Sequence, residues 1–149
     1  MKNLFDLNDR ETVIQRLDRL SPNSSRRWGK MSAAQMLAHC SRALEAGTGD
    51  LPLKQALLGK IFAPFVRSSF LGEKPFGKNS PTDPAFVVSD ERDFAREKEH
   101  LSRVIARFCQ KGPAEAGKQT HSFLGRISGE EWGRVMYKHL DHHFRQFGA

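Results

Sequence analysis

The chain alternates between segments in which apolar residues recur every three or four positions and segments that show no period. Apolar residues at this spacing form one face of an amphipathic helix. The pattern predicts four long helices, over residues 9–20, 31–47, 90–110 and 128–148. Only residues 85–88 (AFVV) have the character of a strand. We therefore expect an all-α fold in which the four helices pack as a bundle.

Two of the predicted helices begin with a capping box, in which a serine and a residue three positions later satisfy each other's free backbone N–H groups. Ser32 and Gln35 form this pair at the start of the second helix, and Ser128 and Glu131 form it at the start of the last. Both boxes precede an apolar stripe. The beginnings of these two helices are the most firmly predicted boundaries in the chain.

The other boundaries depend on single capping and helix-breaking residues. Asn8 or Asp9 is the expected cap of the first helix, and Asp90 is the expected start of the third. Glycine tolerates the left-handed conformation that closes many helices. The expected ends are Gly47 or Gly49 for the second helix, the Gly112-Pro113 step for the third and Gly148 for the last.

Two further segments lie between the second and third long helices. Residues 53–71 predict a short amphipathic helix that Pro64 bends or ends, and it suits a pocket wall or a dimer face. Its basic residues are too few for firm attachment to lipid. Residues 71–89 are rich in proline and glycine and predict a long irregular loop that covers a pocket. A polar linker follows at 111–120.

The composition fits one globular domain spanning residues 1–149. The N-terminus lacks the apolar core of a signal peptide, and no segment is long and apolar enough to span a membrane. Cys40 and Cys109 are too few for a disulfide framework, so we expect a cytoplasmic protein. The net charge of +7 raises the question of nucleic acid. The basic residues are scattered and form no DNA- or RNA-binding motif, which disfavours a nucleic-acid partner.

Three of the six histidines, His139, His142 and His143, lie within five residues on the last predicted helix. At about 100° per residue, His139 and His143 fall on the apolar stripe, whereas His142 falls towards its edge. The i, i+4 pair can share one metal ion, because their Cβ atoms are about 5–6 Å apart. The same pair can also be two core residues that hydrogen-bond to backbone carbonyls. A third ligand from elsewhere would favour the metal.

His39, on the second predicted helix, is the candidate third ligand. It lies at the border of the apolar stripe, between core and solvent, where a lone histidine is usually a surface or hydrogen-bonded residue. Catalytic zinc sites use three protein ligands and keep one position open. Cys40 points about 100° away from His39 around the helix, which disfavours it as a fourth ligand.

The segments Trp28–His39 (WGKMSAAQMLAH) and His139–Gln146 (HLDHHFRQ) resemble the DinB-like (DinB/YfiT) superfamily, and within it a branch known mainly as a domain of unknown function. The resemblance covers nearly the whole chain in helix order, except for the inserted segment at about 51–90. It implies a four-helix bundle, often dimeric, whose metal is bound by one histidine of the second helix and an H-x-x-x-H pair of the last. The ligands it implies are His39, His139 and His143, with His142 as a neighbour that does not bind the metal.

The resemblance implies a metal site but does not name a reaction. An ion held by three neutral imidazoles keeps open positions and can lower the pKa of a bound water or small thiol. We therefore expect a metal-dependent enzyme that activates a small thiol or water, as a thiol transferase or a hydrolase does. Three imidazoles suit zinc best, and nickel, iron and manganese are alternatives. The expected partners are a small-molecule substrate and a second copy of the chain. The alternative is a helical bundle that serves protein association and keeps a structural or vestigial metal site. Roles for His121, for His142 and for the 71–89 loop stay open.

Overall fold

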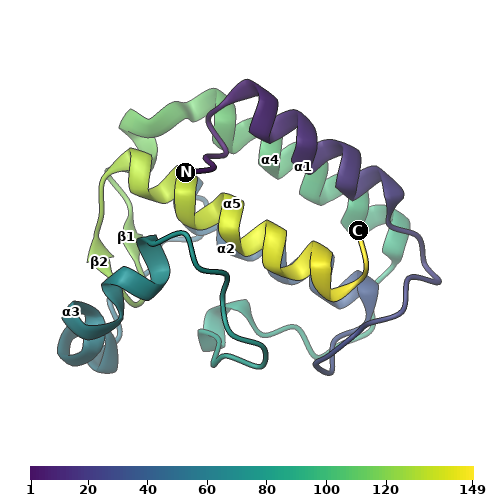
Figure 1. Ribbon diagram of the computed structural model, residues 1–149, viewed down its shortest axis with the longest axis horizontal. Helices are drawn as coiled ribbons and strands as arrows, with labels where there is room; N and C mark the ends of the chain where they lie inside the picture. Colours follow the sequence, from purple (N-terminus) through teal and green to yellow (C-terminus); the bar gives the residue numbers. More distant parts are fainter.

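The computed structural model describes all residues, 1–149, and is mostly helical (Figure 1). The elements along the chain are α1 (Leu7–Arg19), α2 (Ala33–Thr48), α3 (Leu57–Leu71), the 3-10 turn η1 (Pro84–Phe86), α4 (Phe94–Ala116), β1 (Thr120–His121), β2 (Gly125–Arg126) and α5 (Gly129–Gln146). The prediction of a predominantly helical chain is confirmed. The antiparallel hairpin β1–β2, in which Thr120 lies opposite Arg126, was not predicted.

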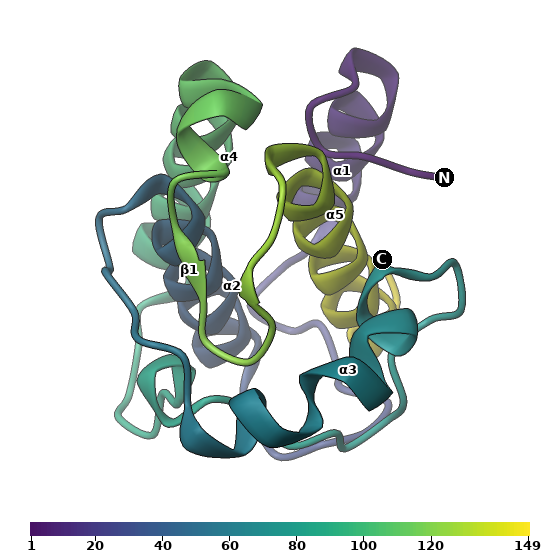
Figure 2. The same cartoon turned by 90° about the vertical axis from the view of Figure 1, so that its left-hand side faces the viewer.

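The core lies between α1, α2, α4 and α5, each of which contacts at least two of the others. Its largest fully buried side chains come from all four of these helices and from the N-terminal segment. They include Leu4, Leu17, Met36, Phe108, Trp132 and Phe144. The helix α3 stands apart from this group and contacts α5 and β2 (Figure 2). None of the helices is both long enough and apolar enough to cross a membrane.

The two predicted capping boxes are confirmed. The Ser32 hydroxyl accepts from the Gln35 N–H while the Gln35 side chain accepts from the Ser32 N–H, and Ser128 and Glu131 repeat the arrangement. The second helix ends at the left-handed Gly49 (φ +82°). These local signals fix the residues at which α2 and α5 begin.

The predicted cap of the first helix was wrong. Asp6, rather than Asn8 or Asp9, accepts from the backbone N–H groups of Asn8 and Asp9. Asp9 lies in the first helical turn, and its carboxylate accepts from the Asn3 N–H and pairs with Lys2. The acidic side chain that accepts from the free N–H groups of this helix therefore lies two to three residues earlier than predicted.

For the third helix, the predicted start was wrong, whereas the predicted end before the Gly112-Pro113 step is confirmed. It starts after Asp93, whose side chain accepts from the Arg96 N–H, rather than at Asp90. Its first part ends at Gly112, whose φ of +75° is not helical, and a second, short helical part follows as far as Ala116, so α4 is kinked at this step. Glycine tolerates this angle, and proline is acceptable in a first helical turn because its missing N–H is not needed there. Part of the expected linker at 111–120 is therefore helical.

The structure also corrects the segment between α2 and α4. The amphipathic helix begins at Leu57 rather than at residue 53, and it continues past Pro64 to Leu71. Pro64 is exposed, so the carbonyl that lacks an N–H partner in the preceding turn can bond to water. Residues 85–88 do not form a strand, because Pro84–Phe86 make a 3-10 turn capped by Asp83.

Candidate metal centre

Helices α2 and α5 bring together the three histidines that the resemblance implied as ligands. One ring nitrogen from each of His39, His139 and His143 lies within 4.8 Å of the other two. The Nε2 atoms of His39 and His139 are 2.9 Å apart. His143 faces both rings, with centroid distances of 4.7 Å to each. The expectation that α2 brings its imidazole within reach of the pair on α5 is thus met, and whether a metal binds there stays a prediction.

His39 is held by the segment that follows α3. Its Nδ1 lies 2.9 Å from the backbone carbonyl of Phe86. A carbonyl only accepts, so Nδ1 carries the proton and Nε2 keeps a free lone pair. The side chain is buried rather than at the border with solvent, because η1 and the residues around it cover a side of α2 that the helix pattern alone leaves open. The expected position of His39 at that border was therefore wrong.

His143 is held through Gln146, one helical turn further along α5. Its Nδ1 lies 2.8 Å from the Gln146 Oε1, and the Gln146 amide nitrogen donates to the Trp28 carbonyl at 2.8 Å. Because the amide nitrogen already donates to that carbonyl, the amide oxygen faces His143 and accepts its Nδ1 proton. The His143 Nε2 is thereby left with a free lone pair, as in His39. Gly29 is required beside this contact, since a Cβ there would lie 2.5 Å from the Gln146 nitrogen.

His139 differs from the other two because its Nδ1 is buried and has no hydrogen-bond partner. The neutral ring carries one proton. A proton on Nε2 bridges to His39 and leaves Nδ1 bare, whereas a proton on Nδ1 leaves two lone pairs facing each other. Neither state satisfies all the nitrogens, and an unpaired buried polar atom is costly. A cation shared by the inward nitrogens removes the conflict between the facing lone pairs.

Burial keeps the three rings neutral. It lowers the pKa of His143 to about 3 and the pKa of His39 below its usual value, against the raising effect of the hydrogen bonds to Gln146 and Phe86. The pKa of His139 is also lowered well below its usual value, by burial and then by the neighbouring histidines. Each ring therefore carries a single proton near neutral pH. Neutral imidazole is the form that binds metal ions.

His142 and His121 lie near the cluster without joining it. The His142 ring packs edge-on against Trp28 and His143, with centroid distances of 5.6 and 5.0 Å. His121, on β1, accepts at Nδ1 from the backbone N–H groups of Phe123 and Leu124. Burial lowers the pKa of His121 to about 4, so the ring is neutral, with its proton on Nε2.

The loop after α3 contacts the cluster at one point and its surroundings at two others. The Phe86 ring stands edge-on to His39, the Phe76 ring lies 6.2 Å from that of His142, and the Lys78 ammonium sits 4.9 Å from the Trp28 ring. These contacts are consistent with the prediction that the 71–89 loop covers a pocket. Sequence reasoning missed the Phe86 and Trp28 carbonyls, because backbone atoms leave no residue signature. Gln146 had a signal, since it lies one helical turn after His143.

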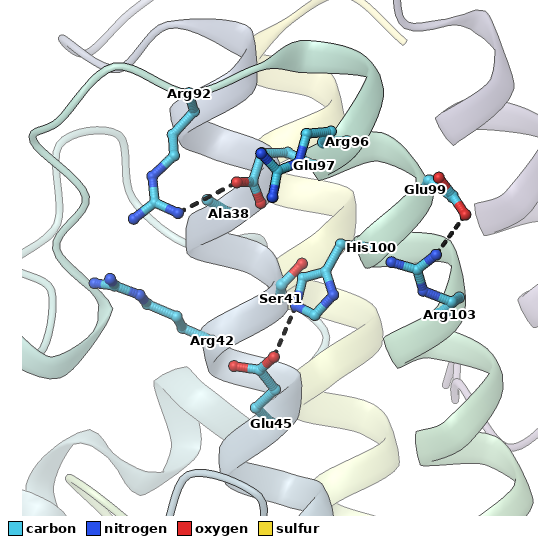
Figure 3. A pocket seen from close by; sticks show the side chains of 10 residues that line it. All are labelled: Ala38, Ser41, Arg42, Glu45, Arg92, Arg96, Glu97, Glu99, His100 and Arg103. Carbon is cyan, nitrogen blue, oxygen red and sulfur yellow. Dashed lines mark hydrogen bonds and ion pairs between the residues drawn. The ribbon is translucent and has the colours of Figure 1, made fainter.

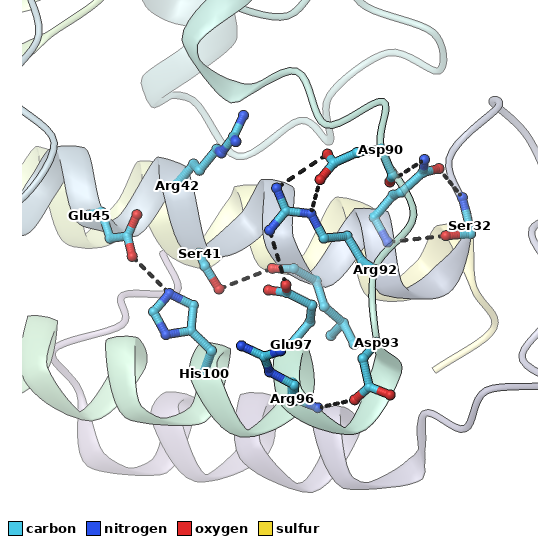
Figure 4. Close-up of polar contacts among 12 residues, drawn as sticks. Ser32, Ser41, Arg42, Glu45, Asp90, Arg92, Asp93, Arg96, Glu97 and His100 are labelled. Atoms are coloured by element: carbon cyan, nitrogen blue, oxygen red, sulfur yellow. Dashed lines mark hydrogen bonds and ion pairs between the residues drawn. The ribbon is translucent and has the colours of Figure 1, made fainter.

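A second polar region lies on the side of α2 that faces α4. It is a groove of about 390 Å³ whose only apolar lining residue is Ala38 (Figure 3). Most of its charges are matched. His100 bonds to Glu45 at 2.8 Å, and Arg92 bridges Asp90 and Glu97 (Figure 4). Arg42 donates to the Val87 carbonyl, next to the residue that holds His39. These contacts tie α2, α4 and the covering segment together.

Cys40 is not part of the histidine cluster. Its thiol is fully buried, lies 3.7 Å from the sulfur of Met36, and has a pKa that burial raises. A thiol in this environment stays protonated and inert.

Comparison with known proteins places the chain in a family without an assigned activity. Residues 1–149 match the family described as "Protein of unknown function (DUF1569)", and the chain belongs to this family. No curated protein and no solved structure matches the chain. The geometry of the histidine cluster is therefore the main indication of what the protein does.

Proposed function

We propose that this protein is a metal-dependent enzyme of the DinB-like type, a four-helix bundle in which His39, His139 and His143 hold one divalent ion. The observation that carries the proposal is the convergence of three neutral imidazoles from α2 and α5. Two of them have their outer nitrogen engaged by a carbonyl-type oxygen, which leaves the inner nitrogen free. Metal-binding histidines commonly have an outer partner of this kind.

The three imidazoles are suitable ligands for a divalent metal ion. No carboxylate or cysteine joins the three imidazoles, so the ion would keep its full positive charge. When bound, such an ion supplies Lewis acidity, which lowers the pKa of water or of a small thiol to near neutral. Zinc suits this donor set best, with nickel, iron and manganese as alternatives.

The protein's own residues have separate tasks in this proposal. The Phe86 carbonyl and the Gln146 amide orient His39 and His143. The Phe86 ring packs edge-on against His39, and the Phe76 ring packs against His142 beside the cluster. A low-molecular-weight thiol or water is the proposed nucleophile, and a small electrophile is the proposed substrate.

The first test is the metal content of untagged protein that has never touched a chelating resin. We expect about one divalent ion per chain, its loss in His143→Ala, and its retention in the matched control His142→Ala. Protein without metal, whose melting temperature does not change when zinc or nickel is added, would overturn the proposal, because a ligand that binds only the native state must raise that temperature.

The second candidate is a protein-association module in which the same site is structural. One observation favours it, an exposed apolar face on α3. Screening the loaded protein with thiols and electrophiles separates the candidates. Thiol-dependent turnover that is absent in His143→Ala supports the enzyme. Stoichiometric metal that raises the melting temperature without any turnover supports the structural site.

A further inference from the structure

Helix α3 carries most of the large apolar side chains that the protein exposes. Eight such residues are exposed in the whole chain, and five of them lie on this helix, with exposed fractions between 48 and 78%. They are Leu57, Leu58, Ile61, Phe62 and Phe65. We call this set the α3 stripe. Their spacing places them on one side of the helix.

The α3 stripe cannot turn inward, because the opposite side of the helix is fixed to the protein. Gly59 lies so close to the hairpin loop that a Cβ would come within 2.4 Å of the Phe123 carbonyl oxygen. Arg67 pairs with Glu131 on α5 at 2.5 Å. Lys138 of α5 donates to backbone carbonyls at the end of α3. Figure 2 shows α3 at one end of the molecule, with the hairpin and α5 on its inner side.

The exposed area is large for a monomer. The five exposed fractions together amount to about three complete side chains, or roughly 600 Å² at about 200 Å² for each large apolar side chain. This equals the upper end of the largest apolar patch on a typical monomer, roughly 300–600 Å². It approaches the roughly 800 Å² that each partner contributes to a standard interface. The α3 stripe is therefore large enough to form the centre of a stable contact.

The charges around the α3 stripe favour protein over lipid as its partner. Lipid-binding segments carry several free basic residues. Within α3 there are only Lys60 and Arg67, and Arg67 is already paired with Glu131. Lys60 lies about 100° from Ile61 around the helix, so its ammonium can stay in water when the stripe is covered.

The arrangement of the α3 stripe matches a second copy of itself. Leu57, Ile61 and Phe65 are spaced four residues apart and form one ridge centred on Ile61. A two-fold axis through this point runs the two helices antiparallel, so that Leu57 meets Phe65 of the second copy and Ile61 meets its own counterpart. Symmetric interfaces require this reciprocity, in which residue i contacts j and j contacts i.

We propose that α3 is the contact surface between two copies of this chain, related by a two-fold axis near Ile61. The proposal does not depend on the metal centre. It joins two copies at the helix whose C-terminal end leads into the loop over the histidines.

Size-exclusion chromatography with light scattering tests the proposal on the full chain. We expect a dimer at micromolar concentration, and a dissociation constant raised at least about 100-fold in Ile61→Glu, since a carboxylate at the centre of the contact loses its water. Val87→Glu is the matched control, because Val87 is also half exposed but lies outside α3. It should leave the dimer intact, and circular dichroism should show both variants folded.

Cysteine cross-linking tests the register. Ile61→Cys should form an intermolecular disulfide under mild oxidation, because the two-fold axis places the two cysteines side by side. Ser68→Cys is exposed on the same helix but lies seven residues from the axis, so the two copies of this cysteine would be about 20 Å apart and should not cross-link. The wild type, with Cys40 and Cys109, is the control for background disulfides.

Three results would overturn the proposal. The first is a wild-type monomer at micromolar concentration, and the second is a dimer that survives Ile61→Glu. The third is a monomer that sediments with vesicles containing anionic lipid and loses that property in Ile61→Glu, which would make the α3 stripe a lipid-binding surface.

Discussion

Two polar regions lie on different sides of α2, and they differ in whether their polar groups have partners within the protein. In the groove towards α4, acids and bases are interleaved, so that Glu45 meets His100 and Arg92 meets both Asp90 and Glu97. In the cluster towards α5, three neutral rings converge with no acid among them. The charged groups of the groove pair with one another, whereas in the cluster imidazole nitrogens face each other. An external cation is the partner that the cluster lacks and the groove does not need.

Burial separates the two regions further. The charged side chains of the groove are partly exposed, so their ion pairs are screened by water and contribute little to stability. The histidine rings are mostly buried, and the outer nitrogens of His39 and His143 are each engaged by a single oxygen atom. Geometry at the cluster is therefore fixed before any ligand arrives. Such preorganisation is typical of a binding centre rather than of a surface network.

The largest expected effect is on zinc affinity, which a substitution in the cluster should lower and one in the groove should not. His39→Ala removes one of the three inward nitrogens and should weaken zinc binding roughly 1000-fold, more than the loss of an outer-shell partner does. His100→Ala removes the groove histidine and should leave zinc affinity unchanged. Titration against a chromophoric chelator measures both variants. Equal affinities in the two variants would contradict the comparison.

The pH dependence of stability gives the next effect, measured on metal-free protein. The pKa of His143 is about 3 and that of His121 about 4, whereas both are about 6.5 when unfolded. Between these values the unfolded chain binds protons that the folded chain does not, so stability falls as the pH falls below 6.5. From pH 7 to pH 5 each ring should cost about 2 kcal/mol in the free energy of unfolding.

Urea denaturation at the two pH values measures this loss, and His121→Asn supplies the internal check. The variant should lose about 2 kcal/mol less than the wild type between pH 7 and pH 5, because one buried ring is gone. A loss of the same size in both proteins would mean that His121 does not contribute.

A smaller effect is expected from the residue that orients His143. Gln146→Leu removes the acceptor for the Nδ1 proton and should reduce zinc affinity about 10- to 100-fold. Gln146→Glu keeps an oxygen acceptor and should retain more of the affinity, although it loses the bond to Trp28. Gln119→Leu, at a more exposed amide that donates to Glu115, is the matched control. A Glu variant as weak as the Leu variant would point to packing rather than orientation.

The smallest effect is expected in the groove. Glu45→Gln replaces the carboxylate that bonds to His100 with an amide and should change the free energy of unfolding by less than about 1 kcal/mol, with no change in metal binding. Chemical denaturation and the chelator titration check the two parts. A large loss of zinc affinity would show that the groove and the cluster act as one site.

The sequence determined the helices whose signals are local. Capping boxes at Ser32 and Ser128 fixed the starts of α2 and α5, because each depends on residues three positions apart. The i, i+4 spacing fixed His139 and His143 on one face of α5. Where the signals competed, the boundaries shifted, as when Asp93 rather than Asp90 capped α4. These errors moved helix ends by a few residues and left the candidate site unchanged.

Only the tertiary structure decided how His39 is used. Its place on α2 indicated a side chain near solvent, yet a carbonyl 47 residues away and the rings of α5 enclose it. The hairpin β1–β2 and the outward direction of the α3 stripe were decided in the same way. Helix periodicity predicts which residues share a face, but the packing of distant segments decides which residues that face contacts. A backbone carbonyl is common to every residue, so no sequence pattern marks the one that orients a ligand.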